Sequence, residues 1–240
     1  MPTRPRSGVG RSERGRSEKG RPTLSRAKVL SEAVALADSE GLDALTMRAL
    51  AERLGVVPMA LYKHVGDKED LIDSMVDAVI EEFPAAPAEL PWREAVAAML
   101  TGARGVVIAH PWARRALETR IERTPTVLAH MERVSQCFLS GGFTADQTHH
   151  VMHLLGPRIW GFSPELFVPA PNAEPPRKRK RPVEPPNPAD YPAIMSIAAD
   201  AQSRRPGAGC DEDFEFAFAV DVLLGAIERL AEQGFESPDG

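Results

Sequence analysis

The sequence predicts an all-α fold, and three observations support this prediction. Apolar residues recur at intervals of three and four along most of the chain, which is the period of one face of an α-helix. Val, Ile and Thr rarely alternate with polar residues, as they would in half-buried strands. Gly, Pro, Thr and Asp fall between the periodic segments, where helices are expected to begin or end.

The charge of the chain is distributed unevenly. The net charge is −5, yet residues 1–30 alone carry a formal charge of +7. Residues 1–22 contain few side chains that could be buried, so we expect a disordered basic arm. A basic segment beside an acidic body is typical of proteins that contact nucleic acid. Arg21 lies next to the first predicted helix and is the arm residue that we assign to such a contact.

Residues 46–65 contain two short amphipathic segments separated by a turn. The apolar face of the first segment extends from Met47 to Leu54. Gly55 follows it, where a left-handed residue commonly ends a helix. Pro58 then falls at the start of the second segment, where no backbone N–H is needed. Two short helices joined by a tight turn predict a helix-turn-helix motif.

The pattern T-x-R-x-L-A-x-R-L-G-V-x-P-x-A-L-Y-x-H-V-x-x-K-x-x-L runs from Thr46 to Leu71. It resembles the DNA-binding head of the TetR family of transcriptional repressors, and the likeness covers about residues 24–83. Val57 departs from the family pattern, in which Ser or Thr often precedes the recognition helix. The change removes a side-chain cap worth about 1 kcal/mol, which Pro58 is expected to offset in part by fixing φ.

The resemblance implies an N-terminal DNA-binding domain at residues 23–84, with the motif at about 46–65. Its helices are predicted at about 25–39, from 46, at 58–64 and from 67 to about 83. We expect phosphate contacts from Thr46, Tyr62, His64 and Lys68. We expect Arg48, Met59, Ala60 and Lys63 to face or approach base edges, and Pro58 is also assigned to the DNA-binding surface. The ring of Tyr62 is expected to be buried with its hydroxyl on a phosphate, and a structural hydrogen bond is an alternative role for His64.

Residues 90–235 are predicted to form a larger helical domain for effector binding and dimerisation. The phrases HPWARRALETR and SGGFTADQTHHVMHLLGPRIWGFSPELF resemble the C-terminal domain of tetracycline repressors. One helix of this domain is predicted from Thr144 to about Phe167, kinked at Pro157. Residues 169–190 are rich in Pro and charge, so we expect a disordered insertion, and we interpret its basic run as a solvated loop.

The resemblance implies that this domain holds a small-molecule effector. Candidate lining residues are Met99, His110, Trp112, Met131, Val134, Phe138, His153 and Trp160. Core packing would explain most of them equally well. His110 precedes Pro111, where tetracycline repressors have a histidine that meets the drug-bound metal. We infer no metal or cofactor, because no carboxylate partner of His110 is evident. The spacing of His149 and His153 could ligate zinc, but two histidines alone are a weak signal, and we favour a surface or pocket-edge role for them.

The last helix, predicted at about 211–232, has two apolar faces. The face assigned to its own domain consists of Phe216, Val220, Leu223, Ile227 and Leu230. The other face consists of Phe214, Phe218, Val222 and Gly225. A second copy of the chain is the obvious partner for that face. The resemblance likewise implies a homodimer formed through late helices.

Taken together, these features predict a ligand-responsive repressor that binds a palindromic double-stranded operator as a dimer. Its two recognition helices would lie about 34–36 Å apart. One alternative is an architectural DNA-binding regulator without an effector. Another is a small-molecule enzyme built on His110, His149 and His153, although no signature of nucleophilic or carboxylate-pair catalysis is present.

The sequence also bears on location. No run of about 18 apolar residues is present, so we expect no membrane span. The N-terminus lacks the apolar core of a secretory signal. Cys137 and Cys210 fit no metal-ligand spacing and are interpreted as free thiols, which predicts a cytoplasmic protein.

Overall fold

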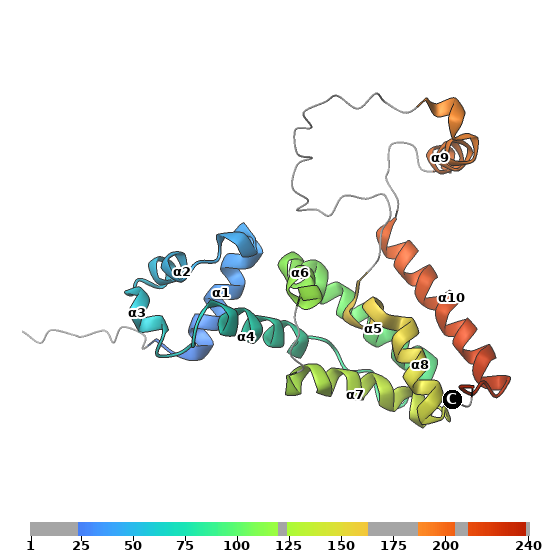
Figure 1. Ribbon diagram of the computed structural model, residues 1–240, viewed down its shortest axis with the longest axis horizontal. Helices are drawn as coiled ribbons and strands as arrows, with labels where there is room; N and C mark the ends of the chain where they lie inside the picture. The colour runs from blue at the N-terminus through green and yellow to red at the C-terminus, as the bar shows by residue number, and fades with distance from the viewer. Residues whose placement is uncertain (1–23, 120–123, 163–186, 205–210, 239–240) are drawn as a thin grey trace, which may run out of the picture.

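The computed structural model describes residues 24–119, 124–162, 187–204 and 211–238. Within these ranges every regular element is helical, which confirms the all-α prediction. The head, α1 to α4, lies at one end of an elongated molecule, and the body, α5 to α8 with α10, lies at the other (Figure 1). The basic arm with Arg21, Cys210 and the basic run of the insertion lie outside the described residues.

Three of the four helices of the head have side-chain caps at their N-termini. Their bounds are α1 Arg26–Glu40, α2 Met47–Leu54 and α4 Lys68–Glu81, with α3 at Pro58–Leu61 and a 3₁₀ turn η1 at Leu42–Ala44. Ser25, Thr46 and Asp67 each accept a hydrogen bond from a backbone N–H in the first turn of the helix that follows. Side-chain oxygens at these positions satisfy donors that the helix itself leaves unpaired.

The turn between α2 and α3 has the predicted geometry. Gly55 has φ 68° and ψ 33°, and its N–H is bonded to carbonyls in the last turn of α2. Val57 provides no side-chain cap, and Pro58 is the first residue of α3. The predicted end of this helix at His64 is wrong. The His64 N–H donates to the Leu61 carbonyl at 2.8 Å, so the backbone tightens into a turn after Leu61.

The body contains longer helices. Their bounds are α5 Trp92–Ala109, α6 Pro111–Thr119, α7 Pro125–Ser140, α8 Ala145–Leu155 and α10 Glu212–Glu232. Contrary to prediction, α8 ends at Leu155, and the chain continues as the 3₁₀ helix η2, Gly156–Trp160. Pro157 explains this end, because proline lacks the N–H that would continue the α-helical ladder.

The C-terminal end of the predicted insertion is more regular than expected. Pro188–Asp190 forms the 3₁₀ turn η3, and the Asn187 side chain accepts a hydrogen bond from the Ala189 N–H. The helix α9, Pro192–Arg204, follows. All of its residues are exposed, including the apolar side chains of Ile194 and Ile197. Hence α9 buries none of its residues on the rest of the described chain.

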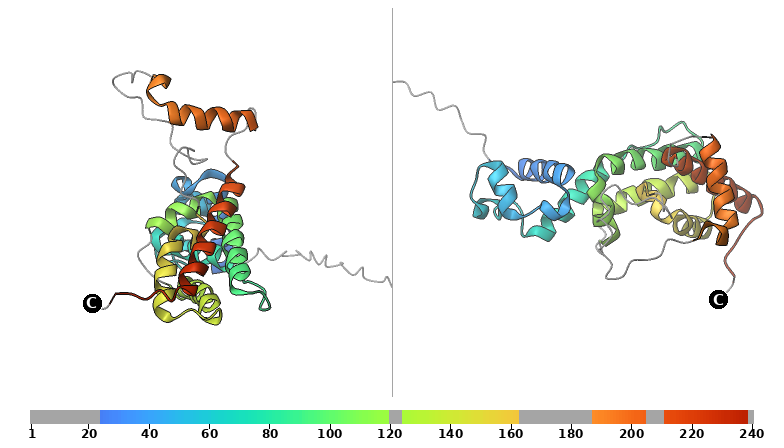
Figure 2. Two further views of the ribbon diagram at one scale, coloured as in Figure 1. Left: turned by 90° about the vertical axis from the view of Figure 1, so that its right-hand side faces the viewer. Right: turned by 90° about the horizontal axis from the view of Figure 1, so that it is seen from above.

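The head and the body share one of two hydrophobic clusters. The first cluster joins the inner faces of α1 to α4 to residues of the body such as Val107, Trp112, Ala116 and Val127. The second lies between α5, α7, α8 and α10. Figure 2 shows α4 leading from the head into the body. The position of the head therefore depends on α6 and on the start of α7. None of the described helices is long and apolar enough to cross a membrane.

The helix α10 packs its inner face on the body. That face consists of Phe216, Val220, Leu224 and Ile227. The prediction that Leu223 and Leu230 complete it was wrong in part, since Leu223 is half-buried and Leu230 is exposed. At about 100° per residue the face is centred between Phe216 and Leu224, which places Leu230 at its edge.

Candidate nucleic-acid interface

The short helix α3 exposes an unusual set of side chains. Val57 and Met59 are 68% and 72% exposed, and Tyr62 is 45% exposed, whereas Leu61 and Val65 are buried. Inward-facing residues thus fix the segment to the head while large apolar and aromatic groups face solvent. Contiguous exposed apolar side chains commonly mark a binding surface.

Most residues assigned to DNA contact lie on this surface. The exposed ones are Thr46, Arg48, Pro58, Met59, Tyr62 and Lys63. Ala60, His64 and Lys68 are half-buried. The expected burial of the Tyr62 ring is wrong, because α3 ends at Leu61 and the inward positions are already filled by Leu61 and Val65.

The start of α2 and the start of α4 both present polar groups. The Thr46 hydroxyl accepts a hydrogen bond from the Ala49 N–H at 3.0 Å, and its own proton remains able to donate. Lys68 is the first residue of α4. Asp70 accepts a hydrogen bond from the Gly66 N–H at 2.7 Å, which fixes the loop before Lys68. A hydroxyl, an ammonium and helix N-termini suit phosphate oxygens.

Arg26 supports this surface and was not identified from the sequence. Its guanidinium donates to the His64 carbonyl at 2.8 Å and to the Ser74 hydroxyl at 2.7 Å. It therefore ties the turn after α3 to α4. The only signal in the sequence was a basic side chain in the first turn of a helix, where the helix dipole disfavours positive charge.

Two family models cover most of the chain. Residues 29–75 match bacterial regulatory proteins of the tetR family, and residues 83–230 match the tetracyclin repressor-like C-terminal domain. The chain belongs to the TetR family. An HTH-type transcriptional regulator of Saccharopolyspora erythraea is 31% identical over 220 residues, which cover 88% of this chain and 87% of that protein. This TetR-family protein is thus a DNA-binding transcriptional regulator, and the alternative of an enzyme is wrong.

Solved structures agree with the TetR-family fold. ActR from Streptomyces coelicolor, in complex with actinorhodin, superposes with a TM-score of 0.64 at 22% identity, covering 87% of this chain and 97% of ActR. BioQ with its natural double-stranded DNA operator superposes with a TM-score of 0.58 at 18% identity, covering 86% of this chain and 99% of BioQ. At these identities the likeness shows the fold alone.

The residues proposed to line an effector pocket lie at several places in this TetR-family body. Met99, Val134 and Phe138 are buried in the second cluster, and Trp112 is buried in the first. Trp160 is half-buried. Met131 and His153 line a hollow of about 490 Å³ between α7 and α8. The other residues that line this hollow are Ser135, Leu139, Ala145, Thr148, His149 and Met152.

His149 and His153 lie on the exposed side of this hollow, and their ring centroids are 4.7 Å apart. Among the described residues, no group of three or more His, Cys, Asp or Glu side chains could hold a metal ion. Cys137 is a free thiol.

His130 is a buried polar residue that sequence reasoning missed. Its Nε2 lies 2.8 Å from the Ile159 carbonyl, and its Nδ1 has no hydrogen-bond partner. Its ring packs against Phe83 and Trp160, with centroids 5.0 and 5.3 Å away. Burial lowers the pKa of His130, despite its bond to Ile159, and the charge of Arg133 lowers it further. The only signal was a histidine in the apolar face of α7.

This burial predicts an acid-sensitive fold. Below an ordinary histidine pKa of about 6.5, the unfolded chain binds a proton at His130 that the folded chain resists. The unfolding free energy should therefore fall as pH drops from 6.5 toward the lowered folded pKa, by up to about 1.4 kcal/mol per pH unit. Urea unfolding at pH 7 and pH 5 tests this. The loss should be smaller in His130→Phe, and an equal loss in both proteins would contradict the assignment.

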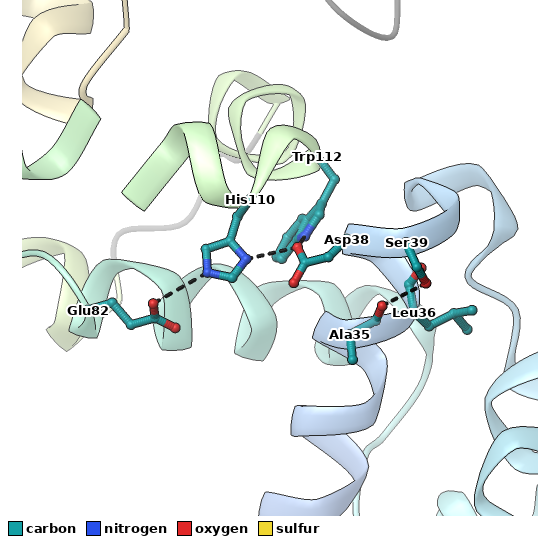
Figure 3. A network of polar contacts seen from close by, with 7 residues as sticks. All are labelled: Ala35, Leu36, Asp38, Ser39, Glu82, His110 and Trp112. Carbon is teal, nitrogen blue, oxygen red and sulfur yellow. Dashed lines mark hydrogen bonds and ion pairs between the residues drawn. The ribbon is translucent and has the colours of Figure 1, made fainter. Parts of the chain in front are cut away.

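His110 lies where the head meets the body. Its Nδ1 is 2.8 Å from Asp38 Oδ1 in α1, and its Nε2 is 3.3 Å from Glu82 Oε2 at the end of α4 (Figure 3). The Trp112 indole N–H donates to the same Asp38 oxygen at 2.6 Å. We name Asp38, Glu82, His110 and Trp112 the junction cluster. Its carboxylates come from the head, so both partners of His110 are remote in sequence.

Proposed function

We propose that this protein is a repressor that binds a palindromic operator as a homodimer and is released by a small-molecule effector. The observation that carries the proposal is the exposed face of α3, with Met59 and Tyr62 in solvent on a rigidly packed head. Such a face suits a major groove, where apolar tips contact thymine methyl groups and polar tips contact base edges.

The contacts proposed for each side chain follow from its place on this surface. Phosphate contacts set the position of the head, and they come from Thr46, Tyr62, His64 and Lys68. The bases are approached by Arg48, Met59, Ala60 and Lys63. Pro58 lies on the same surface. Arg26 holds the turn after α3 in place through His64 and Ser74. The operator bound to BioQ supports the same mode of use for this fold.

The outer face of α10 supports the dimer. Arg93 bonds to Asp221 at 2.8 Å and to Glu228 at 2.5 Å, which ties α10 to the start of α5 along the side between its two apolar faces. The outer side carries Phe214 and Phe218, whose rings stack with centroids 6.3 Å apart.

These rings and Val222 are at least half exposed. A repeat of four residues places all three on one face of the helix. Burying them against a second copy would remove a large apolar surface from water. Gly225 is half-buried and lies seven residues after Phe218, on the same side of the helix. A Cβ there would lie 3.4 Å from the Arg93 guanidinium.

The hollow between α7 and α8 is the proposed effector site. A volume of about 490 Å³ suits a small molecule. Met131, Leu139 and Met152 offer apolar walls, and His149 and His153 offer hydrogen-bonding groups. The site therefore favours an amphipathic ligand with an apolar body and polar substituents. The complex of ActR with actinorhodin supports a small-molecule ligand for this fold.

Contacts between α7 and α4 provide a route from this site to the head. The Thr124 hydroxyl, at the start of α7, donates to Asp77 of α4 at 2.6 Å. His130 packs on Phe83, just after α4. A ligand that binds one placement of α7 more tightly than another would shift α4 and the spacing of the two heads.

The decisive experiment is a titration of fluorescent duplexes from the chain's own promoter region. We expect binding that is tighter than to a shuffled duplex and that weakens steeply with salt. A panel of amphipathic compounds that includes actinorhodin should contain one that releases the duplex. Equal affinity for the shuffled duplex would reject the operator. Release by the same compound from a chain with a blocked hollow, Ser135→Trp, would reject the proposed effector site.

A further inference from the structure

We propose that the junction cluster is a proton-sensitive positioning site that fixes the DNA-binding head on the body, with His110 as the group that titrates. This inference rests on the proposed function, because the head is assigned as the part that meets DNA. It extends that function by adding a response to protons.

The cluster joins four helices at one point. Asp38 comes from α1, Glu82 caps α4, His110 caps α5 and Trp112 lies in α6. The His110 side chain is 12% exposed, whereas Asp38 and Glu82 are 30% and 54% exposed. One largely buried imidazole therefore lies between two carboxylates of the head. Figure 3 shows its two nitrogens directed toward Asp38 and Glu82.

This geometry suits the imidazolium. A protonated histidine donates from both ring nitrogens, whereas a neutral one donates from a single nitrogen. In the neutral form, either Asp38 or Glu82 would face a lone pair. Burial opposes protonation of His110, but its hydrogen bonds and charge attraction to Asp38 and Glu82 outweigh burial and raise its pKa.

Several other charged groups of the surrounding helices are engaged elsewhere. Arg115 of α6 lies 3.7 Å from Asp43, and Arg114 bonds to Glu118 within α6. Glu40 of α1 lies 3.9 Å from Arg53. Toward the body, Arg104 of α5 pairs with Asp213, and Asp77 of α4 bonds to Thr124. Within the described ranges, Asp38 and Glu82 are the ionisable groups in contact with the imidazole.

Deprotonation of His110 would weaken the junction. Trp112 and His110 bond to the same oxygen of Asp38, so any movement of that carboxylate changes the hydrogen bond of the indole N–H. The folded pKa is raised, so the stabilisation is complete below about pH 6.5 and is lost as pH rises through the folded pKa. Above it, apolar contacts of α6 with α1 and α4 would hold the head without this bridge.

Nuclear magnetic resonance of the full chain tests the proposal without DNA. The chain contains three tryptophans, so 5-fluorotryptophan gives three ¹⁹F signals, and Trp112→Phe identifies one. The Trp112 signal should titrate with the same midpoint as the His110 ring nitrogens, above pH 6.5. The Trp92 signal, from the second cluster, should not follow that midpoint.

Variants separate titration from a merely structural role. His110→Gln should abolish the Trp112 transition, and Asp38→Asn or Glu82→Gln should lower its midpoint. His150→Gln is the matched control, because His150 also lies near a carboxylate, Asp146, but far from the junction. Circular dichroism checks that each variant is folded. A Trp112 transition that persists unchanged in folded His110→Gln would overturn the proposal.

Binding of the promoter duplex tests whether the junction matters for regulation. Between pH 6 and pH 8.5, the dissociation constant of the wild type should change by at least about threefold more than that of His110→Gln. Parallel pH profiles would overturn the role in DNA binding. If the wild type binds no duplex at all, the proposed function fails, and the Trp112 titration still decides whether the junction responds to protons.

Discussion

Replacing Tyr62 and Lys68 together by alanine is expected to weaken binding to the promoter duplex by at least about 100-fold. Each side chain would lose a hydrogen bond to a charged phosphate, worth about 1.5–3 kcal/mol, and a dimer loses every contact twice. Tyr62 is exposed and Lys68 begins α4, so neither change removes core packing. Fluorescence anisotropy against salt concentration measures both affinity and its salt dependence.

The salt dependence makes this test specific. Removal of one lysine contact per protomer should reduce the slope of log affinity against log salt by about 2 for a dimer. The pair Tyr191→Ala and Arg204→Ala removes the same kinds of group from the residue before α9 and from its last residue, and should leave the slope unchanged. An unchanged affinity in the Tyr62 and Lys68 variant would show that α3 is not the helix that binds the operator.

Replacing Phe218 by glutamate is expected to convert the dimer into monomers and to abolish tight operator binding. Phe218 is 58% exposed and lies between Phe214 and Val222 on the outer face of α10. Burial of a phenylalanine contributes about 1.5–3 kcal/mol per protomer, and the new carboxylates would face each other across the two-fold axis without partners. The dimer dissociation constant should rise by about a thousandfold or more.

Sedimentation equilibrium measures this constant, and circular dichroism confirms that the monomer is folded. Leu128→Glu is the matched control, since Leu128 is an exposed leucine on α7, away from α10. It should leave the dimer intact. If Phe218→Glu remained a dimer of the same affinity, the assembly would have to use another surface.

Local chemistry in the sequence predicted most of the head. Thr46, Gly55, Pro58 and Asp67 each act through groups within a few residues, so their roles as cap, turn and helix start can be read from a linear pattern. The end of α3 was missed because tightening after Leu61 depends on which side chains fill the core, and neither propensity nor period reports that.

The body was less predictable for the same reason. Periodicity identified the two faces of α10, and the structure places Phe214, Phe218 and Val222 in solvent as expected. Met99, Val134 and Phe138 were candidate pocket residues, yet they lie in the core. A methionine or phenylalanine on a helix face has the same pattern whether it lines a cavity or fills one, because both roles favour apolar side chains.

The sequence by itself therefore determined the helical fold, the helix-turn-helix and the unpartnered face of α10, since each follows from spacing within a single helix or turn. The tertiary structure alone decided the roles of Arg26, His110 and His130. Their partners are carbonyls and carboxylates from segments remote in the sequence. Hydrogen bonds between remote segments depend on which helices pack together, and the periodicity of one helix does not report which partner it packs against.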